Sequence, residues 1–298
     1  MAQKYSDIRN SDLVPQVLVF GAAKCATSWM SACLTEHPEI AVMPQSIGGA
    51  YTLDTRGDID KQDAWYASLK KGKVSAEISP WYFITRGVPE RIKELAPDTR
   101  LILMLRHPVE RAASAIRHVL GKHPEYKGTS VVELIKKYPN IVDVGHYERH
   151  LGRYLKTFDR SQILIILTDD VQSHPHDVVK EVYRFIGVSD DFLPKMVTSK
   201  TNTGAARASW LYPKYLHFLK WARQIPGAQV LKGALAKVGI TPFTLERKIE
   251  ALGKTSQYRL SQKDTEWLQT EYQDTITWLD EILDRDLTAW RRSRQHPS

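Results

Sequence analysis

Short apolar runs alternate with helix-like segments along the first two thirds of the chain, and this alternation constrains the fold more than any other feature. Strands that alternate with helices form a parallel sheet whose crossover helices cover its faces. We therefore predict an α/β fold of three layers, with a central parallel sheet flanked by helices. The predicted strands are Val17–Phe20, Ile40–Val42, Val74–Glu77, Leu101–Leu105 and Ile163–Leu167, and the predicted helices are Thr27–Glu36, Pro89–Leu95, Val109–Leu120, Tyr147–Phe158 and Pro175–Ile186.

The domain organisation follows from the absence of any boundary signal in the sequence. The length of 298 residues allows two domains at ~150 residues each, but the sequence has no internal repeat, low-complexity tract or Gly/Ser linker. We therefore predict one domain over 1–298, with an N-terminal extension over 1–15. A polar, irregular stretch over 189–210 precedes a mostly helical C-terminal part, from about 211 to 298.

Composition excludes several classes of protein. Hydrophobic residues make up 42% and charged residues 26%, which excludes wholesale disorder. Two cysteines, Cys25 and Cys33, form no disulfide framework, and no Cys/His cluster has zinc spacing. The N-terminus is polar and no apolar run approaches ~18 residues. We therefore expect a soluble, cytoplasmic protein with no membrane partner.

The net charge of +8 indicates an anionic partner without identifying it. The basic residues are dispersed, without an arginine-rich tail, so nucleic acid is not the expected partner. A non-catalytic protein that binds a nucleotide or nucleic acid remains an alternative.

The first predicted strand runs into the sequence GAAKCATSWM, which has the features of a phosphate-binding loop. Small residues from Gly21 to Ala26 let the backbone curl closely, and Lys24 adds a positive charge. Thr27 and Ser28 then open a helix, whose free N–H groups and dipole favour an anion. The alternative is a tight turn with a capping threonine and a solvated lysine.

This loop differs from a Walker loop, which places lysine directly before the hydroxyl residue. Lys24 lies three residues before Thr27, and the second glycine is missing. A P-loop kinase or NTPase stays open as an alternative because ILIILTDD ends in Asp169 and Asp170, a pattern found at magnesium sites. We prefer to interpret the two aspartates as a polar strand end.

A second candidate phosphate site follows the strand RLILML, in the sequence RHPVERAASAIRH. Arg106 stands at the carboxyl end of this strand, where open α/β sheets bind ligands. Arg111, Ser114 and His118 are spaced by three and four residues, so they share one face of the following helix. Arginine and serine are donors suited to phosphate oxygens. Two such sites at two strand ends imply a ligand that is phosphorylated at two positions.

The two loops together resemble those of sulfotransferases that use 3′-phosphoadenosine 5′-phosphosulfate (PAPS). GAAKCATSW is similar to that family's 5′-phosphosulfate loop, and RHPVERAASAIRH is similar to its 3′-phosphate motif. EISPWYF, VGHYERHLGRYLKTFDRSQILIILTDD, VYRFIGV and DLTAW also resemble bacterial and glycan-modifying members in order and spacing. The likeness runs from about Val17 to Trp290 and implies a P-loop-like fold.

The resemblance implies roles for individual residues. Lys24 would stabilise the negative charge that develops on the leaving phosphate. The 3′-phosphate would be bound by Arg106 and Ser114, and Arg207, in TNTGAARASW, would reach over the nucleotide. The 5′-phosphate would be cradled by the backbone of Cys25, Ala26, Thr27 and Ser28, and the hydroxyls of Thr27 and Ser28 would assist. Trp29 matches a position that stacks on adenine in some members, and a core tryptophan is the alternative. No metal is implied.

The general base is where the sequence departs from the family pattern. Many members carry a glutamate after the second strand, whereas the corresponding stretch here, AVMPQSIGGAYT, has no carboxylate or histidine. Gln45 can orient an acceptor, but its amide cannot take a proton. His118 is the substitute candidate, because its ordinary pKa of ~6.5 suits proton transfer near neutrality. The alternative is a polar helix histidine without a chemical role. Asp54 and Asp58 are the nearest carboxylates in the sequence.

The expected reaction is therefore sulfuryl transfer from PAPS to a hydroxyl or nitrogen of a small-molecule acceptor, which we expect to be a specialised metabolite. The insert Gly121–Ser130 lies where an acceptor loop is expected. Several residues are candidates for the acceptor pocket or, alternatively, for the core: Gly48, Gly49, Tyr51, Trp65, Trp81, Tyr82 and Phe83.

Overall fold

The computed structural model describes residues 15–43, 67–69, 73–198, 207–208, 254–255 and 258–291, the two short pairs by their backbone alone. The chain divides into two compact units. The first unit comprises Met1–Arg111, Val144–Asn202 and Gln269–Ser298, and the second comprises Ala112–Asp143 and Thr203–Leu268. The prediction of one domain over 1–298 stays a prediction.

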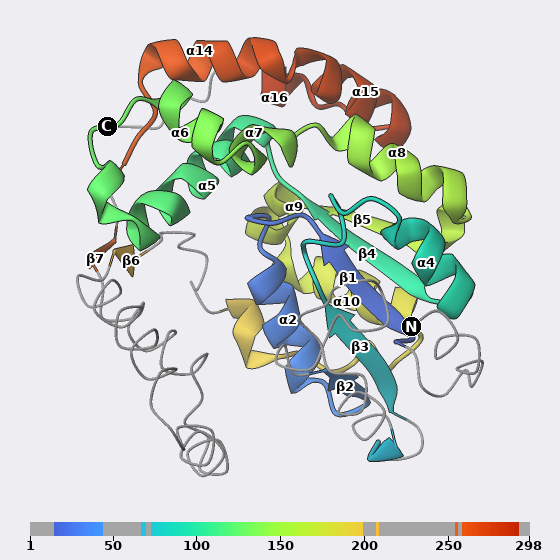
Figure 1. Ribbon diagram of the computed structural model, residues 1–298. Coiled ribbons are helices and arrows are strands. Elements are labelled where there is room, and N and C mark those ends of the chain that lie inside the picture. Colours follow the sequence, from blue (N-terminus) through green and yellow to red (C-terminus); the bar gives the residue numbers. More distant parts are fainter. Residues whose placement is uncertain are drawn as a thin grey trace, which may run out of the picture. The chain divides into compact units, whose positions relative to one another are not determined.

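The first unit is built on a parallel five-stranded sheet with the strand order β2-β3-β1-β4-β5 (Figure 1). The strands are β1 (Val17–Gly21), β2 (Ile40–Val42), β3 (Val74–Ile78), β4 (Arg100–Leu105) and β5 (Ile163–Leu167). All four neighbouring pairs are parallel. The predicted α/β architecture with a central parallel sheet is confirmed, and every predicted strand forms within one residue of its predicted ends.

Helices α2 and α10 lie together, since the Tyr183 hydroxyl of α10 donates to the Cys33 carbonyl of α2 at 3.0 Å. Helix α8 is contacted by α4 and by α15. The helices of this unit are α2 (Thr27–Glu36), α4 (Val88–Leu95), α8 (Tyr147–Thr157), α9 (Thr168–Ser173), α10 (Pro175–Ile186), α15 (Gln273–Leu283) and α16 (Thr288–Arg291), with single turns η3 (Arg160–Gln162) and η4 (Lys195–Thr198).

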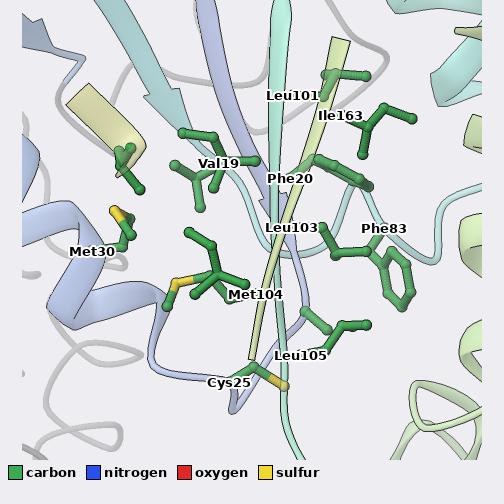
Figure 2. Close-up of a cluster of buried hydrophobic side chains, with 14 of the residues drawn as sticks. Val19, Phe20, Cys25, Met30, Phe83, Leu101, Leu103, Met104, Leu105 and Ile163 are labelled. Carbon is green, nitrogen blue, oxygen red and sulfur yellow. The ribbon is translucent and has the colours of Figure 1, made fainter. Parts of the chain in front are cut away.

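The core of the first unit lies on both faces of the sheet, which explains why its strands are almost continuously apolar. Val19 and Met104 point to the side of the sheet where Met30 of α2 lies, whereas Phe20 and Leu103 point to the opposite side, toward Phe83 (Figure 2). The Phe20 ring lies 4.1 Å from the ring of Tyr154 on α8, centroid to centroid. Burial on both faces therefore fixes the strand register and the edge at which the strand-end loops emerge.

The second unit contains η2 (Pro124–Tyr126), α6 (Val131–Lys137), α7 (Asn140–Asp143) and the paired antiparallel strands β6 (Arg207–Ala208) and β7 (Lys254–Thr255). Helices α5 (Pro108–Lys122) and α14 (Gln262–Glu271) begin in one unit and end in the other. Helix α6 was not predicted, although Ser130 and Glu133 form a capping box at its start. Ser-x-x-Glu before an apolar run signals a helix start, so the pattern was available in the sequence.

The predicted C-terminal helical part is described from residue 258 onward. There α14, α15 and α16 account for most of the chain, while 211–253 lies outside the described residues. Helix α15 packs on α8, and the Thr275 hydroxyl donates to Glu148 at 2.5 Å. His146 lies between two carboxylates, 3.4 Å from Glu148 and 3.2 Å from Glu271. None of the described helices is long and apolar enough to span a membrane.

A glycine is required where β1 passes closest to the turn that follows β3. A Cβ atom built on Gly21 would lie 2.6 Å from the Cβ of Phe83 and 3.1 Å from Leu103 Cδ1. We expect Gly21→Ala to lower the free energy of unfolding by about 1–3 kcal/mol, as overpacking of a core does. Urea unfolding followed by circular dichroism measures the change.

The matched control is Gly152→Ala in α8, where an added Cβ meets nothing within 4 Å. Because alanine favours a helix over glycine, this variant should be neutral or stabilised by about 0.5–1 kcal/mol. An equal loss of stability in both variants would contradict the close approach at Gly21.

Candidate functional site

The sheet has a topological switch point at the carboxyl ends of β1 and β4. These strands are hydrogen-bonded neighbours, but the chain leaves β1 toward β2 and leaves β4 toward β5, on opposite sides. Loops that diverge in this way open a crevice at the edge of the sheet, and ligands of open α/β proteins bind there. The two candidate phosphate sequences supply these two loops.

The loop after β1 has a backbone suited to an anion. Lys24 and Ala26 both adopt left-handed φ angles, of 73° and 61°. Left-handed positions of this kind occur in the concave nests of backbone N–H groups that bind phosphate. Ala26 caps α2 without a side-chain hydrogen bond. Among the described residues, backbone hydrogen bonds leave the N–H groups of Ala26, Thr27 and Ser28 unused.

The side chains of this loop divide into buried and accessible ones. Cys25 and Thr27 are buried, Lys24 is half-buried, and Ser28 is exposed. The start of the loop is tied to the neighbouring strand, since the Ala22 N–H donates to the Met104 carbonyl at 2.8 Å. The loop therefore has a fixed backbone, with a lysine and a serine side chain that solvent reaches.

The loop after β4 presents Arg106, held by an acidic partner. Arg106 Nε and Nη2 both donate to Glu110 Oε2, at 3.1 and 2.9 Å. The Arg106 side chain is 21% exposed and that of Glu110 is 14% exposed. Within the described part of the chain, Glu110 is the only side chain hydrogen-bonded to this guanidinium. The ion pair fixes the edge of the guanidinium that carries Nε and Nη2.

A buried tyrosine connects the two loops. The Tyr147 hydroxyl, at the start of α8, donates to the Arg106 carbonyl at 2.7 Å and lies 3.8 Å from Cys25 Sγ. A carbonyl can only accept a hydrogen bond, so the tyrosine proton points to Arg106. The Cys25 thiol has two acceptors in reach, the tyrosine oxygen and the Ala23 carbonyl at 3.9 Å. The contact from Tyr147 to Arg106 requires the phenol in its protonated form.

Burial keeps both groups protonated. It raises the pKa of the Cys25 thiol, and the positive charges of Arg111 and Arg106 offset only part of this effect. The pKa of Tyr147 also lies well above its ordinary value because the ring is fully buried. Despite its place in the loop, Cys25 is therefore a structural thiol and not a nucleophile.

His107, the residue after Arg106, shapes the start of α5. Its Nδ1 accepts the Val109 N–H at 3.2 Å, and its Nε2 lies 2.8 Å from the Trp290 carbonyl. Because Nδ1 accepts, Nε2 carries the proton and donates to that carbonyl. The buried imidazole thus caps the helix and joins the Arg106 loop to the C-terminal DLTAW sequence.

The same C-terminal sequence engages the two aspartates after β5. Arg285 donates to both carboxylate oxygens of Asp170, at 2.5 and 2.8 Å, and the Trp290 indole N–H donates to Asp169 at 3.1 Å. Both carboxylates thus contribute to folding contacts, which supports their interpretation as a polar strand end. Among the described residues, no three His, Cys, Asp or Glu side chains are grouped so as to hold a metal ion. No observation on these residues favours the kinase or NTPase alternative.

The remaining predicted site residues lie in the core, in the second unit or outside the described residues. Trp29 is buried in the hydrophobic core, which favours the core interpretation over stacking on adenine. Ser114 and His118 follow Arg111 on α5, where Ser114 is buried and His118 half-buried, and both belong to the second unit. Arg207 forms β6, and its side chain lies outside the described residues, as does Gln45. Asp54 and Asp58 also lie outside them.

Sequence reasoning missed three residues that organise the site: Glu110, His107 and Tyr147. Glu110 follows Arg106 at the i,i+4 spacing of a helical ion pair, so this signal was present. His107 precedes a proline at a helix start, a position that favours a capping side chain. Tyr147 lies 41 residues from Arg106, and nothing in the local pattern indicates their contact.

The fold places two loops with features of anion-binding loops at one edge of the sheet of an α/β protein. Comparison with known proteins identifies its family. Residues 14–211 match the family described as the sulfotransferase domain. This match covers more than half of the chain, which therefore belongs to the sulfotransferase-domain family.

Curated relatives agree with this assignment, and a solved structure shares the fold. The chain is 28% identical over 201 residues to mouse heparan sulfate glucosamine 3-O-sulfotransferase 3B1, a match that covers 64% of this chain and 49% of the relative. It is 30% identical over 199 residues to the human 3-O-sulfotransferase 6, covering 62% and 54%. It thus spans about half the length of these relatives. A sulfotransferase structure from Alicyclobacillus acidocaldarius shares the fold, with a TM-score of 0.63, 22% identity and coverage of 94% and 99%.

The buried thiols predict a loss of stability at alkaline pH. Burial raises the pKa of Cys33 from 9.0 to about 12 and raises that of Cys25 from the same ordinary value. Above pH 9 the unfolded thiols ionise while the folded ones stay protonated, so the folded state binds more protons. The free energy of unfolding should then fall with rising pH, by up to about 1.4 kcal/mol per pH unit for each group. Urea unfolding between pH 7 and 11 tests this.

Buried tyrosines add to this loss of stability above pH 10. The variants Cys25→Ala and Cys33→Ala therefore isolate the part of the loss that comes from the thiols. In each variant the free energy of unfolding should fall less steeply than in the wild type between pH 9 and 10. Unchanged slopes in both variants would contradict the assignment.

Because the Tyr147 hydroxyl contacts both loops, Tyr147→Phe should have a specific effect. Loss of the hydroxyl leaves the Arg106 carbonyl and the Cys25 thiol without their shared partner, at a cost of about 1–2 kcal/mol in the free energy of unfolding. Because the loops are then no longer tied, the affinity for adenosine 3′,5′-bisphosphate should also fall several-fold. Titration calorimetry measures the affinity.

Tyr183→Phe is the matched control, since it removes an equally buried hydroxyl that donates to the Cys33 carbonyl, away from both loops. It should lose similar stability and keep the bisphosphate affinity. Equal affinities in the two variants would show that Tyr147 has a structural role only.

Proposed function

We propose that this chain is a PAPS-dependent sulfotransferase that transfers a sulfuryl group to a hydroxyl or nitrogen of its acceptor. The observation that carries the proposal is the pair of anion-binding loops at one switch point, joined through the buried hydroxyl of Tyr147. PAPS carries charged groups on both sides of its ribose, and a protein that binds it needs two such loops at a fixed spacing. Family membership supports the same donor.

The residues present fit this donor. The N–H groups of Ala26, Thr27 and Ser28 are oriented as the first turn of a helix, where phosphate binds. Arg106 presents the part of its guanidinium that Glu110 does not hold, which suits a second phosphate. The donor therefore meets backbone donors and Lys24 at its 5′ side and Arg106 at its 3′ side, with Ser114 as the partner of Arg106 that the family resemblance implies.

When bound, the donor supplies a sulfuryl group whose sulfur–oxygen bond to phosphate breaks as the acceptor oxygen or nitrogen bonds to sulfur. Lys24 stabilises the negative charge that the departing phosphate gains, as does a preorganised cation in other transfer reactions. The N–H groups at the start of α2 bind the same phosphate. The Cys25–Tyr147 contact holds this loop in place, so that its charges need no rearrangement during the transfer.

The acceptor proton must be removed by a group near the acceptor. We propose His118 as the base, with Gln45 orienting the acceptor. Glu77 is a carboxylate at the end of β3, but it is buried beside Leu18 of β1 and accepts the Tyr82 hydroxyl at 2.6 Å. We therefore assign Glu77 to the support of the turn after β3.

Two lines of reasoning bear on the class of acceptor. The curated relatives are named for the glucosamine of heparan sulfate, a polysaccharide, whereas the sequence analysis predicts a small-molecule acceptor such as a specialised metabolite. A single sugar or glycoside meets both descriptions, so we propose that acceptor screens start there.

Thermal unfolding tests the donor proposal directly. Adenosine 3′,5′-bisphosphate at about 100 times its dissociation constant should stabilise the protein by about 2.7 kcal/mol, which raises the melting temperature by several degrees. ATP with magnesium should have a much smaller effect. A shift with magnesium and ATP alone would contradict the proposal and would favour a kinase or NTPase.

Two variants separate the roles of the cations. Lys24→Ala should lower turnover by more than it lowers bisphosphate affinity, because its charge acts on the leaving phosphate. Arg106→Ala should mainly weaken bisphosphate binding, by about tenfold or more, through the loss of charged hydrogen bonds. Steady-state kinetics and calorimetry measure both.

Lys180→Ala and Arg184→Ala, two exposed positions on α10, control for the loss of net charge. Both controls should bind and turn over like the wild type. The reverse pattern for Lys24 and Arg106 would overturn their assigned roles.

A further inference from the structure

The turn that follows β3 combines two buried aromatic residues with one exposed indole. In the sequence Ser-Pro-Trp-Tyr-Phe, Tyr82 and Phe83 are 1% and 0% exposed, whereas Trp81 is 42% exposed. Tyr82 donates to Glu77, and Phe83 packs against Phe20. The neighbours of Trp81 thus provide the packing, and the large apolar ring of Trp81 is left facing solvent.

The position of this turn places Trp81 beside the loop that follows β1. The Ser79 N–H donates to the Val19 carbonyl at 3.0 Å, and the Phe83 N–H donates to the Phe20 carbonyl at 2.9 Å. Trp81 is the central residue between these two anchors. Neighbouring strands lie about 5 Å apart, so the turn runs next to the last residues of β1, from which Lys24 follows.

The backbone of Trp81 is held in place. Its carbonyl accepts the N–H groups of Ile84 and Thr85, both at 3.2 Å, and the Thr85 hydroxyl at 2.8 Å. The Tyr154 hydroxyl of α8 fixes the next carbonyl, that of Tyr82, at 2.8 Å. An exposed indole on so well-anchored a turn is preorganised for contact with a ligand, because little backbone order is lost on binding.

We propose that Trp81 forms one wall of the acceptor subsite, on which a ring of the acceptor stacks. Tryptophan offers a wide, rigid apolar face that binds the flat face of an aromatic ring or the C–H face of a sugar ring. The proposal rests on the proposed sulfotransferase function. It adds the chemical class of the acceptor, a molecule that presents such a ring next to the nucleophilic oxygen or nitrogen.

The test compares Trp81→Ala, Trp81→Phe and Trp267→Ala. Trp267 on α14 is 43% exposed and matches Trp81 in type and exposure. Each protein is loaded with adenosine 3′,5′-bisphosphate for binding or with PAPS for turnover. The probes are a glucosamine disaccharide and 2-naphthol, which distinguish a sugar ring from an aryl ring, and 2-aminoethanol, an open-chain acceptor.

We expect Trp81→Ala to raise KM or the dissociation constant for one ring probe by about tenfold, with bisphosphate affinity unchanged. Trp81→Phe should recover most of the loss, and Trp267→Ala should match the wild type. Binding or turnover of the open-chain probe should not change.

Three results would overturn the proposal while leaving the sulfotransferase function intact. These are equal behaviour of Trp81→Ala and Trp267→Ala, a matching loss of bisphosphate affinity in Trp81→Ala, and a wild type that accepts the open-chain probe but neither ring. A wild type that does not bind the bisphosphate at all would instead refute the proposed function itself.

Discussion

The short hydrogen-bonded chain from Cys25 through Tyr147 to the Arg106 carbonyl is the contact on which the rest of the site depends. Each of the two anion loops follows its own strand, and strand pairing fixes only where each loop begins. The conformation beyond that point is free to vary until a buried group connects the loops. Tyr147 supplies this group from a third element, α8, so the sheet, the helix layer and both loops become one rigid arrangement. Rigid spacing is what recognition of two charges on one ligand requires.

A small number of contacts also fixes the charged side chains of the site. Arg106 is held by Glu110 on the first turn of α5, which orients the guanidinium before any ligand arrives. The next residue, His107, joins that turn to Trp290, whose indole in turn contacts Asp169 after β5. A few C-terminal residues thus close the edge of the sheet around the second loop. Contacts with Arg285 and Trp290 also explain why Asp169 and Asp170 follow β5, a position that a magnesium site could occupy as well.

Local patterns were sufficient to predict the scaffold. All five strands were predicted from short apolar runs, and α2 and α10 were predicted to the residue, because burial on both faces of a sheet leaves a strong signal in each segment. The phosphate loop was predicted from small residues, a lysine and two hydroxyls in sequence. Elements with weaker local signals were missed: α6 is short and its capping box was overlooked, and α9 follows β5 without an intervening turn.

The sequence by itself determined the fold class, the order of the elements and the positions of the two candidate phosphate loops, because each of these is encoded within a few consecutive residues. Only the tertiary structure decided which side chains hold the loops together and which aromatic residues remain exposed. Tyr147 and Arg106 meet across 41 residues, and Trp81, Tyr82 and Phe83 are three consecutive aromatic residues of which one alone faces solvent. Long-range packing decides such outcomes, since the environment of a side chain depends on which distant segments the fold brings against it.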